Sequence, residues 1–206
     1  MSDALLDEPL LARAHRHAVD FLRGLPERFV GAPASRDELR AALAVPLTAG
    51  GEAGETILDA LVAQSHRGVI ANAGPRYFGF VIGGSLPPAL AADWLVSTWD
   101  QNPGLFATSP ITSVVEEIAA EWLLDLFDLP RQSGVGFVTG CQMANFTGIA
   151  AGRHAVLRDA GWNVEENGLA GAPRVNVVTS AESHVTIDVA LRFLGFGTKN
   201  VHRVAS

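Results

Sequence analysis

The chain has 206 residues, of which 48% are hydrophobic and 18% charged, and its formal net charge is −7. This composition excludes a largely disordered chain, and the negative charge without any basic cluster argues against a nucleic-acid partner. The single cysteine excludes an internal disulfide and a zinc site built from several cysteines, so we expect no metal. The sequence has neither a signal-peptide pattern nor an apolar stretch of membrane-spanning length, which predicts a cytoplasmic protein with no membrane partner.

Apolar residues at helical spacing predict that the first third of the chain is helical. We expect amphipathic helices over 5–22, from 36 to about 45, and over 56–69. The pattern Ser35-Arg-Asp-Glu38 is a capping box, which marks the start of the second helix. The amphipathic faces indicate that these helices pack on another surface.

The middle of the chain combines an irregular segment with two helices. Gly74-Pro-Arg-Tyr-Phe-Gly-Phe-Val81 is too rich in glycine and aromatic residues for an ordinary linker. Pro87 or Pro88 starts a predicted helix that runs through Trp99, since proline favours the first turn. A long amphipathic helix is expected from Ser109-Pro110 to Phe127.

From Gly134 onward, apolar strands alternate with helices. We expect strands over 135–139, 175–179 and 201–204, with helices over about 143–158 and 184–194. This β-α-β-α-β order predicts the α/β class, a mostly parallel sheet covered by helices. Ligands of such sheets bind at the carboxyl ends of the strands, where Thr139-Gly-Cys and Ser180–His184 follow two of them.

The segment Gly134-Val-Gly-Phe-Val-Thr-Gly-Cys-Gln-Met-Ala-Asn145 predicts a short strand, a tight turn and the start of a helix. The backbone N–H groups at a helix start have no intrahelical acceptors, so this turn predicts an anion-binding cradle. The glycine spacing does not match the dinucleotide-binding fingerprint. The P-loop motif is excluded because the only lysine is Lys199, far from this turn.

Cys141 offers a second interpretation of the same turn, nucleophilic catalysis. A helix start activates a thiol, and His184 is available as a base. The sequence after Gly140 lacks the second glycine of a nucleophile elbow, which disfavours this interpretation. A structural cysteine is the other alternative.

Four segments, in this order, resemble the group II pyridoxal-phosphate-dependent decarboxylases, which include aromatic amino acid, histidine and glutamate decarboxylases. They are Tyr77-Phe-Gly-Phe80, Ser109-Pro110 followed by Glu116-Glu117, Gly136 to Asn145, and Ser183-His184. The resemblance implies an α/β fold of the fold-type I, transferase-like kind. Its expected parts are an N-terminal helical, dimer-packing segment (1–71), a segment leading into the large domain (72–133), and the start of the cofactor-binding large domain (134–206).

The resemblance also implies a cofactor, pyridoxal 5'-phosphate, and the residues that bind it. Its phosphate would lie at Gly140, Cys141 and Gln142. The family's usual serine is replaced here by cysteine or glutamine, so we expect the backbone N–H groups to bind the phosphate. His184 matches the histidine that stacks on the pyridine ring and helps to position the substrate carboxylate, which makes it the candidate catalytic residue.

Further residues match the family's substrate pocket and subunit interface. Phe80 and Val81 match the segment that lines the pocket, and residues 106–109 match a loop that reaches the partner subunit's site. The resemblance implies an amino acid substrate, and the apolar neighbours of Phe80 hint at an aromatic or apolar side chain. It also implies a homodimer in which the N-terminal helices pack across the partner.

The implied reaction is decarboxylation, in which an amino acid joins the cofactor as an external aldimine and releases carbon dioxide. No residue here matches the family's Schiff-base lysine or ring-nitrogen aspartate, and we expect Lys199 to be a solvated turn residue. We therefore expect the N-terminal portion of an enzyme, inactive alone and completed by a C-terminal portion. The alternatives are a non-catalytic remnant or interaction module of the same fold, or another fold-type I enzyme such as an aminotransferase or carbon–carbon lyase.

Overall fold

The computed structural model describes residues 6–31, 33–47 and 49–205. Its contacts divide the chain into two compact units, residues 1–100 and 101–206. The segments predicted over 1–71, 72–133 and 134–206 are a finer division by element type, which the division into units does not test. No described helix is long and apolar enough to cross a membrane.

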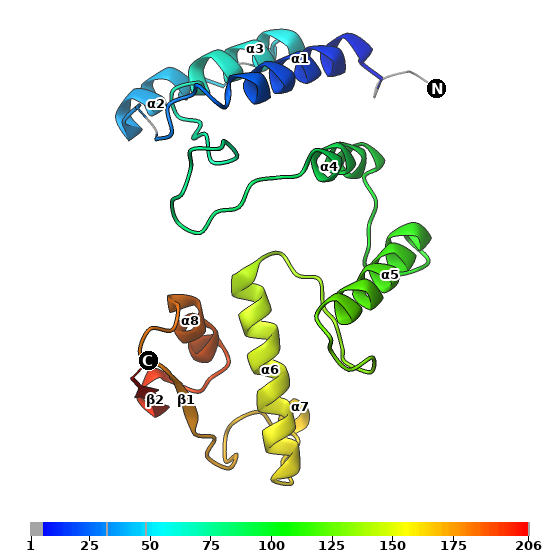
Figure 1. Cartoon of the computed structure of the whole chain (residues 1–206), viewed down its shortest axis with the longest axis vertical. Helices are drawn as coiled ribbons and strands as arrows, with labels where there is room; N and C mark the ends of the chain where they lie inside the picture. The colour runs from blue at the N-terminus through cyan, green and yellow to red at the C-terminus, as the bar shows by residue number, and fades with distance from the viewer. Residues whose placement is uncertain (1–5, 32, 48, 206) are drawn as a thin grey trace. The chain divides into compact units, whose positions relative to one another are not determined.

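Helices dominate both units (Figure 1). The first unit contains α1 (Glu8–Gly24), α2 (Arg36–Leu43), α3 (Gly54–Ser65) and α4 (Pro87–Trp99). The second contains α5 (Pro110–Leu126), α6 (Cys141–Asp159), α7 (Val164–Asn167), β1 (Val177–Ser180), α8 (Val185–Phe193), the 3-10 turn η1 (Thr198–Asn200) and β2 (Val201–Val204).

The predicted helices of the first unit form close to their expected bounds. The capping box of α2 is confirmed, because Ser35 Oγ accepts from the Glu38 N–H at 3.2 Å and Glu38 Oε2 accepts from the Ser35 N–H at 2.7 Å. The start predicted for α1 at residue 5 lies outside the described residues. Asp7 caps α1 by accepting from the Leu10 N–H at 3.0 Å.

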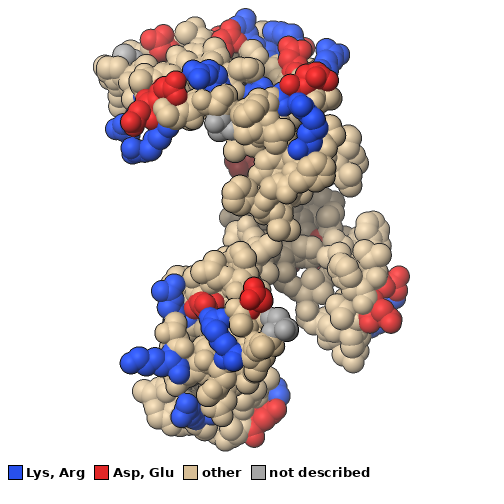
Figure 2. Space-filling model, turned by 60° about the vertical axis from the view of Figure 1, so that its left-hand side comes forward, with Lys and Arg blue, Asp and Glu red and all other residues tan. Residues whose placement is uncertain are grey.

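Contacts of α3 hold the N-terminal helices together, since α3 packs against both α1 and α2 (Figure 1). Asp59 of α3 binds Arg13 and, at 2.8 Å, His17 Nε2 of α1. Figure 2 shows charged side chains of both signs interspersed over these three helices. Among the described residues of this unit, the buried apolar ones are Leu25 and Ala71. The first unit is therefore held largely by partly exposed contacts.

The second unit has a core between α6 and α8. Leu157 of α6 and Leu191 of α8 are no more than 1% exposed, and Leu194, the C-cap of α8, is 4% exposed. Burying one such leucine contributes about 1.5–3 kcal/mol. The Arg153 side chain of α6 donates to the Leu194 carbonyl at the end of α8, at 2.9 Å. These contacts fix the two helices to each other.

The sheet in the described residues consists of β1 and β2, which pair in parallel with Val177 opposite Val201 and Ser180 opposite Val204. The strand predicted over 201–204 is confirmed, and the one predicted over 175–179 begins two residues later and ends one residue later. The strand predicted over 135–139 was wrong. A strand needs a hydrogen-bonded neighbour, and in the described part of the chain this segment has none. Its apolar residues Val135, Phe137 and Val138 are correspondingly exposed.

Candidate functional site

The start of α6 presents unused backbone donors. Gly140 is the N-cap, and the first helical hydrogen bond runs from the Ala144 N–H to the Gly140 carbonyl at 3.0 Å. No side chain caps this end, and the described residues supply no acceptor for the N–H groups of Cys141, Gln142 and Met143. A Cβ added at Gly140 would meet nothing within 4 Å, so the adjacent space is open. Donors and helix dipole together favour an anion here.

His184 occupies the equivalent position on α8, as the N-cap that follows β1 and its turn. Its Nδ1 atom accepts from the Thr186 N–H at 3.3 Å and lies 2.9 Å from the Thr186 hydroxyl. An N–H group can only donate, so Nδ1 carries no proton in this arrangement. The neutral ring therefore holds its proton on Nε2, which is left as a hydrogen-bond donor.

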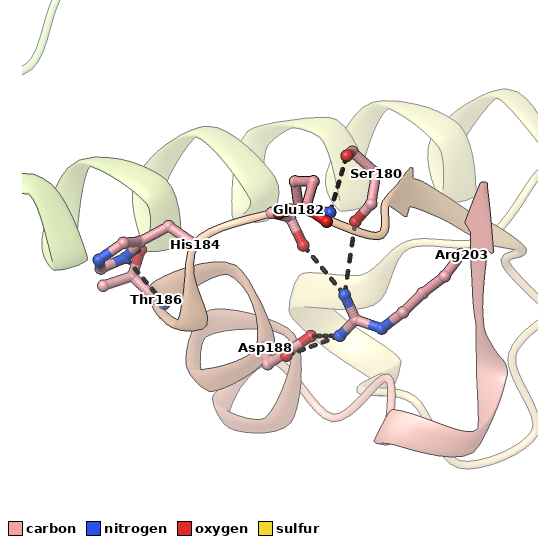
Figure 3. A network of polar contacts seen from close by, with 7 residues as sticks. Ser180, Glu182, His184, Thr186, Asp188 and Arg203 are labelled. Atoms are coloured by element: carbon pink, nitrogen blue, oxygen red, sulfur yellow. Dashed lines mark hydrogen bonds and ion pairs between the residues drawn. The ribbon is translucent and has the colours of Figure 1, made fainter. Parts of the chain in front are cut away.

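Thr186 joins the two helix starts. The Asn145 side-chain amide of α6 donates to Thr186 Oγ1 at 2.8 Å, and the Gln142 amide donates to the Thr186 carbonyl at 3.2 Å. The Thr186 hydroxyl accepts from Asn145 and donates to His184, as Figure 3 shows for the His184–Thr186 pair. The structure thus brings Gln142 and His184, both predicted site residues, into one hydrogen-bond network.

Sequence reasoning missed Thr186 and Asn145 as parts of this network. Asn145 stood at the end of the singled-out segment, four residues after Cys141 and therefore on the same face of the helix. Thr186 stood two residues after His184, a spacing that suits capping of a helix start. Both signals are local, but the pairing between them requires the packing of α6 on α8.

Arg203 of β2 also contacts the turn that carries His184. Its guanidinium donates to both carboxylate oxygens of Asp188, at 2.5 and 2.7 Å. It also donates to Ser183 Oγ at 3.1 Å and to the Ser180 carbonyl at 3.4 Å. Figure 3 shows the guanidinium lying between the end of β1 and the first turn of α8.

Cys141 is exposed at the first position of α6. The described residues place no hydrogen bond between its thiol and His184, whose Nδ1 is engaged by Thr186. A cysteine–histidine nucleophile therefore gains no support from the geometry. No group of three or more metal-binding side chains occurs among the described residues.

Phe80 and Val81 belong to the first unit, and their predicted role in a substrate pocket stays a prediction. Both side chains are fully exposed or nearly so, and both residues have φ of 55°. The Ile82 N–H donates to the Gly79 carbonyl at 3.3 Å, which closes a tight turn around them. Left-handed backbone at two bulky residues costs about 1–2 kcal/mol each, so this turn is strained.

Comparisons with known proteins agree on one family. The pyridoxal-dependent decarboxylase conserved domain matches residues 40–205. The human acidic amino acid decarboxylase GADL1 is 27% identical over 165 residues, which are 80% of this chain and 30% of that protein. The chain thus spans about a third of the length of this relative.

Solved structures share the fold. Mouse CSAD matches with a TM-score of 0.87 and 24% identity over 100% of this chain and 42% of that one. The Oryza sativa TDC structure with PLP and tryptamine matches with a TM-score of 0.83 and 22% identity, over 100% and 45%. The predicted fold class, part of a fold-type I α/β domain, is confirmed. The expected cofactor is confirmed as well, because pyridoxal phosphate serves this family. The chain belongs to the pyridoxal-dependent decarboxylase family.

Proposed function

We propose that the chain is the N-terminal portion of a cytoplasmic pyridoxal-phosphate-dependent enzyme that releases carbon dioxide from an amino acid. The observation that carries this proposal is the open start of α6, joined through Thr186 to the imidazole of His184. When bound, pyridoxal phosphate supplies an electron sink for the carbanion that forms as carbon dioxide leaves. The remaining contributions come from the protein.

The residues at the start of α6 fit the phosphate group. The N–H groups of Cys141, Gln142 and Met143 have no other acceptor in the described residues, and the space beside Gly140 is open. Backbone donors and the helix dipole can hold a dianionic phosphate without an adjacent lysine. The Gln142 side chain is engaged by the Thr186 carbonyl, so its backbone is the group free to bind.

His184 would contact the pyridine ring and orient the substrate carboxylate. With Nδ1 engaged by Thr186, its Nε2–H is the donor that remains for a carboxylate oxygen. A donor of fixed direction positions the bond that breaks, which is a recognised source of rate enhancement. We propose that His184 acts in this way, as a donor.

The lysine that binds the cofactor covalently is proposed to lie outside these 206 residues. Lys199 is exposed in η1, immediately before β2, as expected for a solvated turn residue. The 206 residues alone are then expected to release no carbon dioxide. Borohydride reduction of the full-length protein with its cofactor, followed by peptide mapping, would locate the labelled lysine, and a label at Lys199 would contradict this assignment.

The substrate proposed is an amino acid, and two side-chain classes are the first to test. The human relative is named for acidic amino acids, and the Oryza sativa structure holds tryptamine, an aromatic amine. The exposed apolar side chains of Phe80 and Val81 favour the aromatic or apolar class. A homodimer is proposed with it, supported by exposed apolar residues on α1 and α3 such as Leu11 and Leu61.

Substitution of Cys141 by proline tests the cradle directly. Proline is well tolerated at the first position of a helix but removes its N–H group, so Cys141→Pro deletes one proposed phosphate donor and little else. Loss of one hydrogen bond to a charged group predicts a Kd for pyridoxal phosphate about 10- to 100-fold higher. Titration of the full-length protein, followed by the absorbance of the bound cofactor, measures the Kd.

Two variants serve as controls. Cys141→Ala keeps the N–H group and removes only the thiol, so its Kd should match that of the wild type. Arg36→Pro makes the same backbone change at the start of α2, where Ser35 still caps the helix. Equal loss of affinity in Cys141→Ala and Cys141→Pro would assign the binding to the thiol and contradict the proposed cradle.

A further inference from the structure

Arg203 contacts residues both before and after His184, in the turn and in α8. Its guanidinium binds the Ser180 carbonyl where β1 ends, the Ser183 hydroxyl next to His184, and the Asp188 carboxylate one turn further along α8. The contacts therefore lie on both sides of His184 in the sequence (Figure 3). A single side chain thus relates the strand end, the turn and the helix to one another.

The backbone of Arg203 is part of the sheet. Arg203 lies on β2, opposite Thr179 of β1 in the parallel register. The Ala181 N–H of the turn donates to the Val204 carbonyl at 2.8 Å, which extends the contact with β2 by one residue. Movement of the turn away from the sheet would break both this bond and the contacts of the guanidinium.

The hydrogen bonds within the turn do not attach it to β2. The Glu182 N–H donates to Ser180 Oγ at 3.0 Å, and the Ser183 N–H donates to the Ser180 carbonyl at 3.1 Å. These bonds lie within residues 180–183, so they shape the turn but do not reach β2. The Arg203 guanidinium, through Ser183 and Asp188, links both the turn and the first turn of α8 to β2, whereas the Ala181–Val204 bond links only the start of the turn.

A purely stabilising ion pair is the alternative, and partial exposure argues against it. The side chains of Arg203 and Asp188 are 40% and 30% exposed. Ion pairs in contact with solvent contribute little to global stability. The planar guanidinium, by contrast, gives direction to several hydrogen bonds at once, which a lysine ammonium does not.

We propose that Arg203 is a positioning residue for His184, acting through Ser183 and Asp188 to hold the turn in place for the cofactor. The proposal rests on the proposed function for its catalytic consequence, but its structural part is independent of the cofactor. Removing the guanidinium should loosen the turn without unfolding the protein.

The experiment compares Arg203→Met, Arg203→Lys and Asp188→Asn with the wild type, all as full-length protein. Arg158→Met is the matched control, since it breaks an exposed arginine–aspartate pair with Asp159 on α6. Hydrogen–deuterium exchange of the peptide that covers residues 181–188 is measured without cofactor. We then measure, for each variant, the Kd of pyridoxal phosphate, kcat, KM and the melting temperature.

We expect Arg203→Met and Arg203→Lys to exchange faster over 181–188, with melting temperatures close to that of the wild type. Misplacement of His184 should lower kcat by roughly ten- to a hundredfold even at saturating cofactor, with a smaller change in KM. Asp188→Asn should show a weaker form of the same pattern. Arg158→Met should behave as the wild type.

Three results would overturn the inference: unchanged exchange over 181–188 in Arg203→Met, faster exchange with wild-type kcat, or wild-type behaviour of Arg203→Lys. A melting temperature that falls in proportion to kcat would assign Arg203 to stability alone and would also overturn it. If the wild-type protein binds no cofactor, the proposed function fails, and the exchange measurement then decides the structural part by itself.

Discussion

The two units of the chain are stabilised in different ways. In the second unit, the buried apolar residues among those described are Leu124, Leu157, Val164, Ala190, Leu191 and Leu194. In the first unit they are Leu25 and Ala71, and contact between α1 and α3 includes the partly exposed pairs of Asp59. Large apolar side chains of α4, such as Trp94 and Trp99, remain substantially exposed.

Because of this difference, the candidate site residues are held in place by the buried core of the second unit. The open helix start and His184 are both fixed to a core within the second unit, so their relative geometry comes from that unit alone. Burial is the larger source of stability, because exposed ion pairs each contribute about 0–1 kcal/mol. Substitutions in the two units should therefore differ in size, and the following predictions test that expectation.

The largest effect is expected for Leu157→Ala. This residue of α6 is fully buried, so truncation should lower the free energy of unfolding by about 2–5 kcal/mol. Leu61→Ala on α3 is the matched change in the first unit, where the side chain is 52% exposed, and should cost far less. Urea denaturation of both variants measures the difference. Equal losses would contradict the contrast between the units.

A smaller effect is expected for Thr186→Val, which keeps the shape of the side chain and removes its hydroxyl. The Asn145 amide then loses its acceptor and His184 Nδ1 loses one donor, which should cost about 1–3 kcal/mol of stability. The affinity for pyridoxal phosphate should fall as well, because the two helix starts are no longer joined through this hydroxyl.

Two threonine variants control for side effects of the Thr186 change. Thr186→Ser retains the hydroxyl and should keep the wild-type affinity for the cofactor. Thr98→Val removes an exposed hydroxyl that binds the Trp94 carbonyl within α4 and should change the unfolding free energy little. Cofactor titration and denaturation of all three variants test the assignment, and wild-type affinity in Thr186→Val would remove Thr186 from the site.

The smallest effect on stability is expected for Asp59→Asn, and it should depend on pH. The hydrogen bond from His17, and then the charge of Arg13, hold the pKa of the Asp59 carboxyl below its usual value of 3.8. A pKa lowered by folding stabilises the protein above the unfolded-state value, and this stabilisation is lost as the pH falls through the folded-state value. Wild type and Asp59→Asn should therefore differ at neutral pH and converge in acid.

Melting temperatures from about pH 7 down to about pH 3 measure this convergence. Asp20→Asn is the control, since Asp20 and Arg23 form a loose pair at 3.9 Å in which both side chains are mostly exposed. A difference between wild type and Asp59→Asn that grows in acid would have the wrong sign and would reject the assigned cause.

Helices were predicted well from the sequence because their signals are local. The capping box at Ser35 and the prolines at the starts of α4 and α5 each specify a helix start through neighbouring residues. The short helix α7 was missed, although Asn163 caps it and Gly168 follows it. The strand expected over 135–139 depended on a neighbouring strand, which local sequence does not encode.

The candidate site likewise contains residues that local sequence predicts and residues that depend on packing. Gly140 and His184 follow from a turn, a helix start and a resemblance, all of which local sequence carries. Thr186 and Arg203 act through partners that lie 41 and 15 residues away in the chain, and only packing brings those partners together. Sequence patterns therefore indicated the groups proposed to face a ligand, whereas the structure was needed for the groups proposed to orient them.

The parallel register of β1 and β2 gives Arg203 a consequence during folding. The strands have four residues each, none of them fully buried, and strand register is weakly specified where neither face of a strand is buried. Successive side chains point to opposite faces, so a slip by one residue would carry the guanidinium to the far face of the sheet, away from Asp188. The ion pair with Asp188 forms in the native alignment and is lost in the slipped one, so it favours the correct strand register.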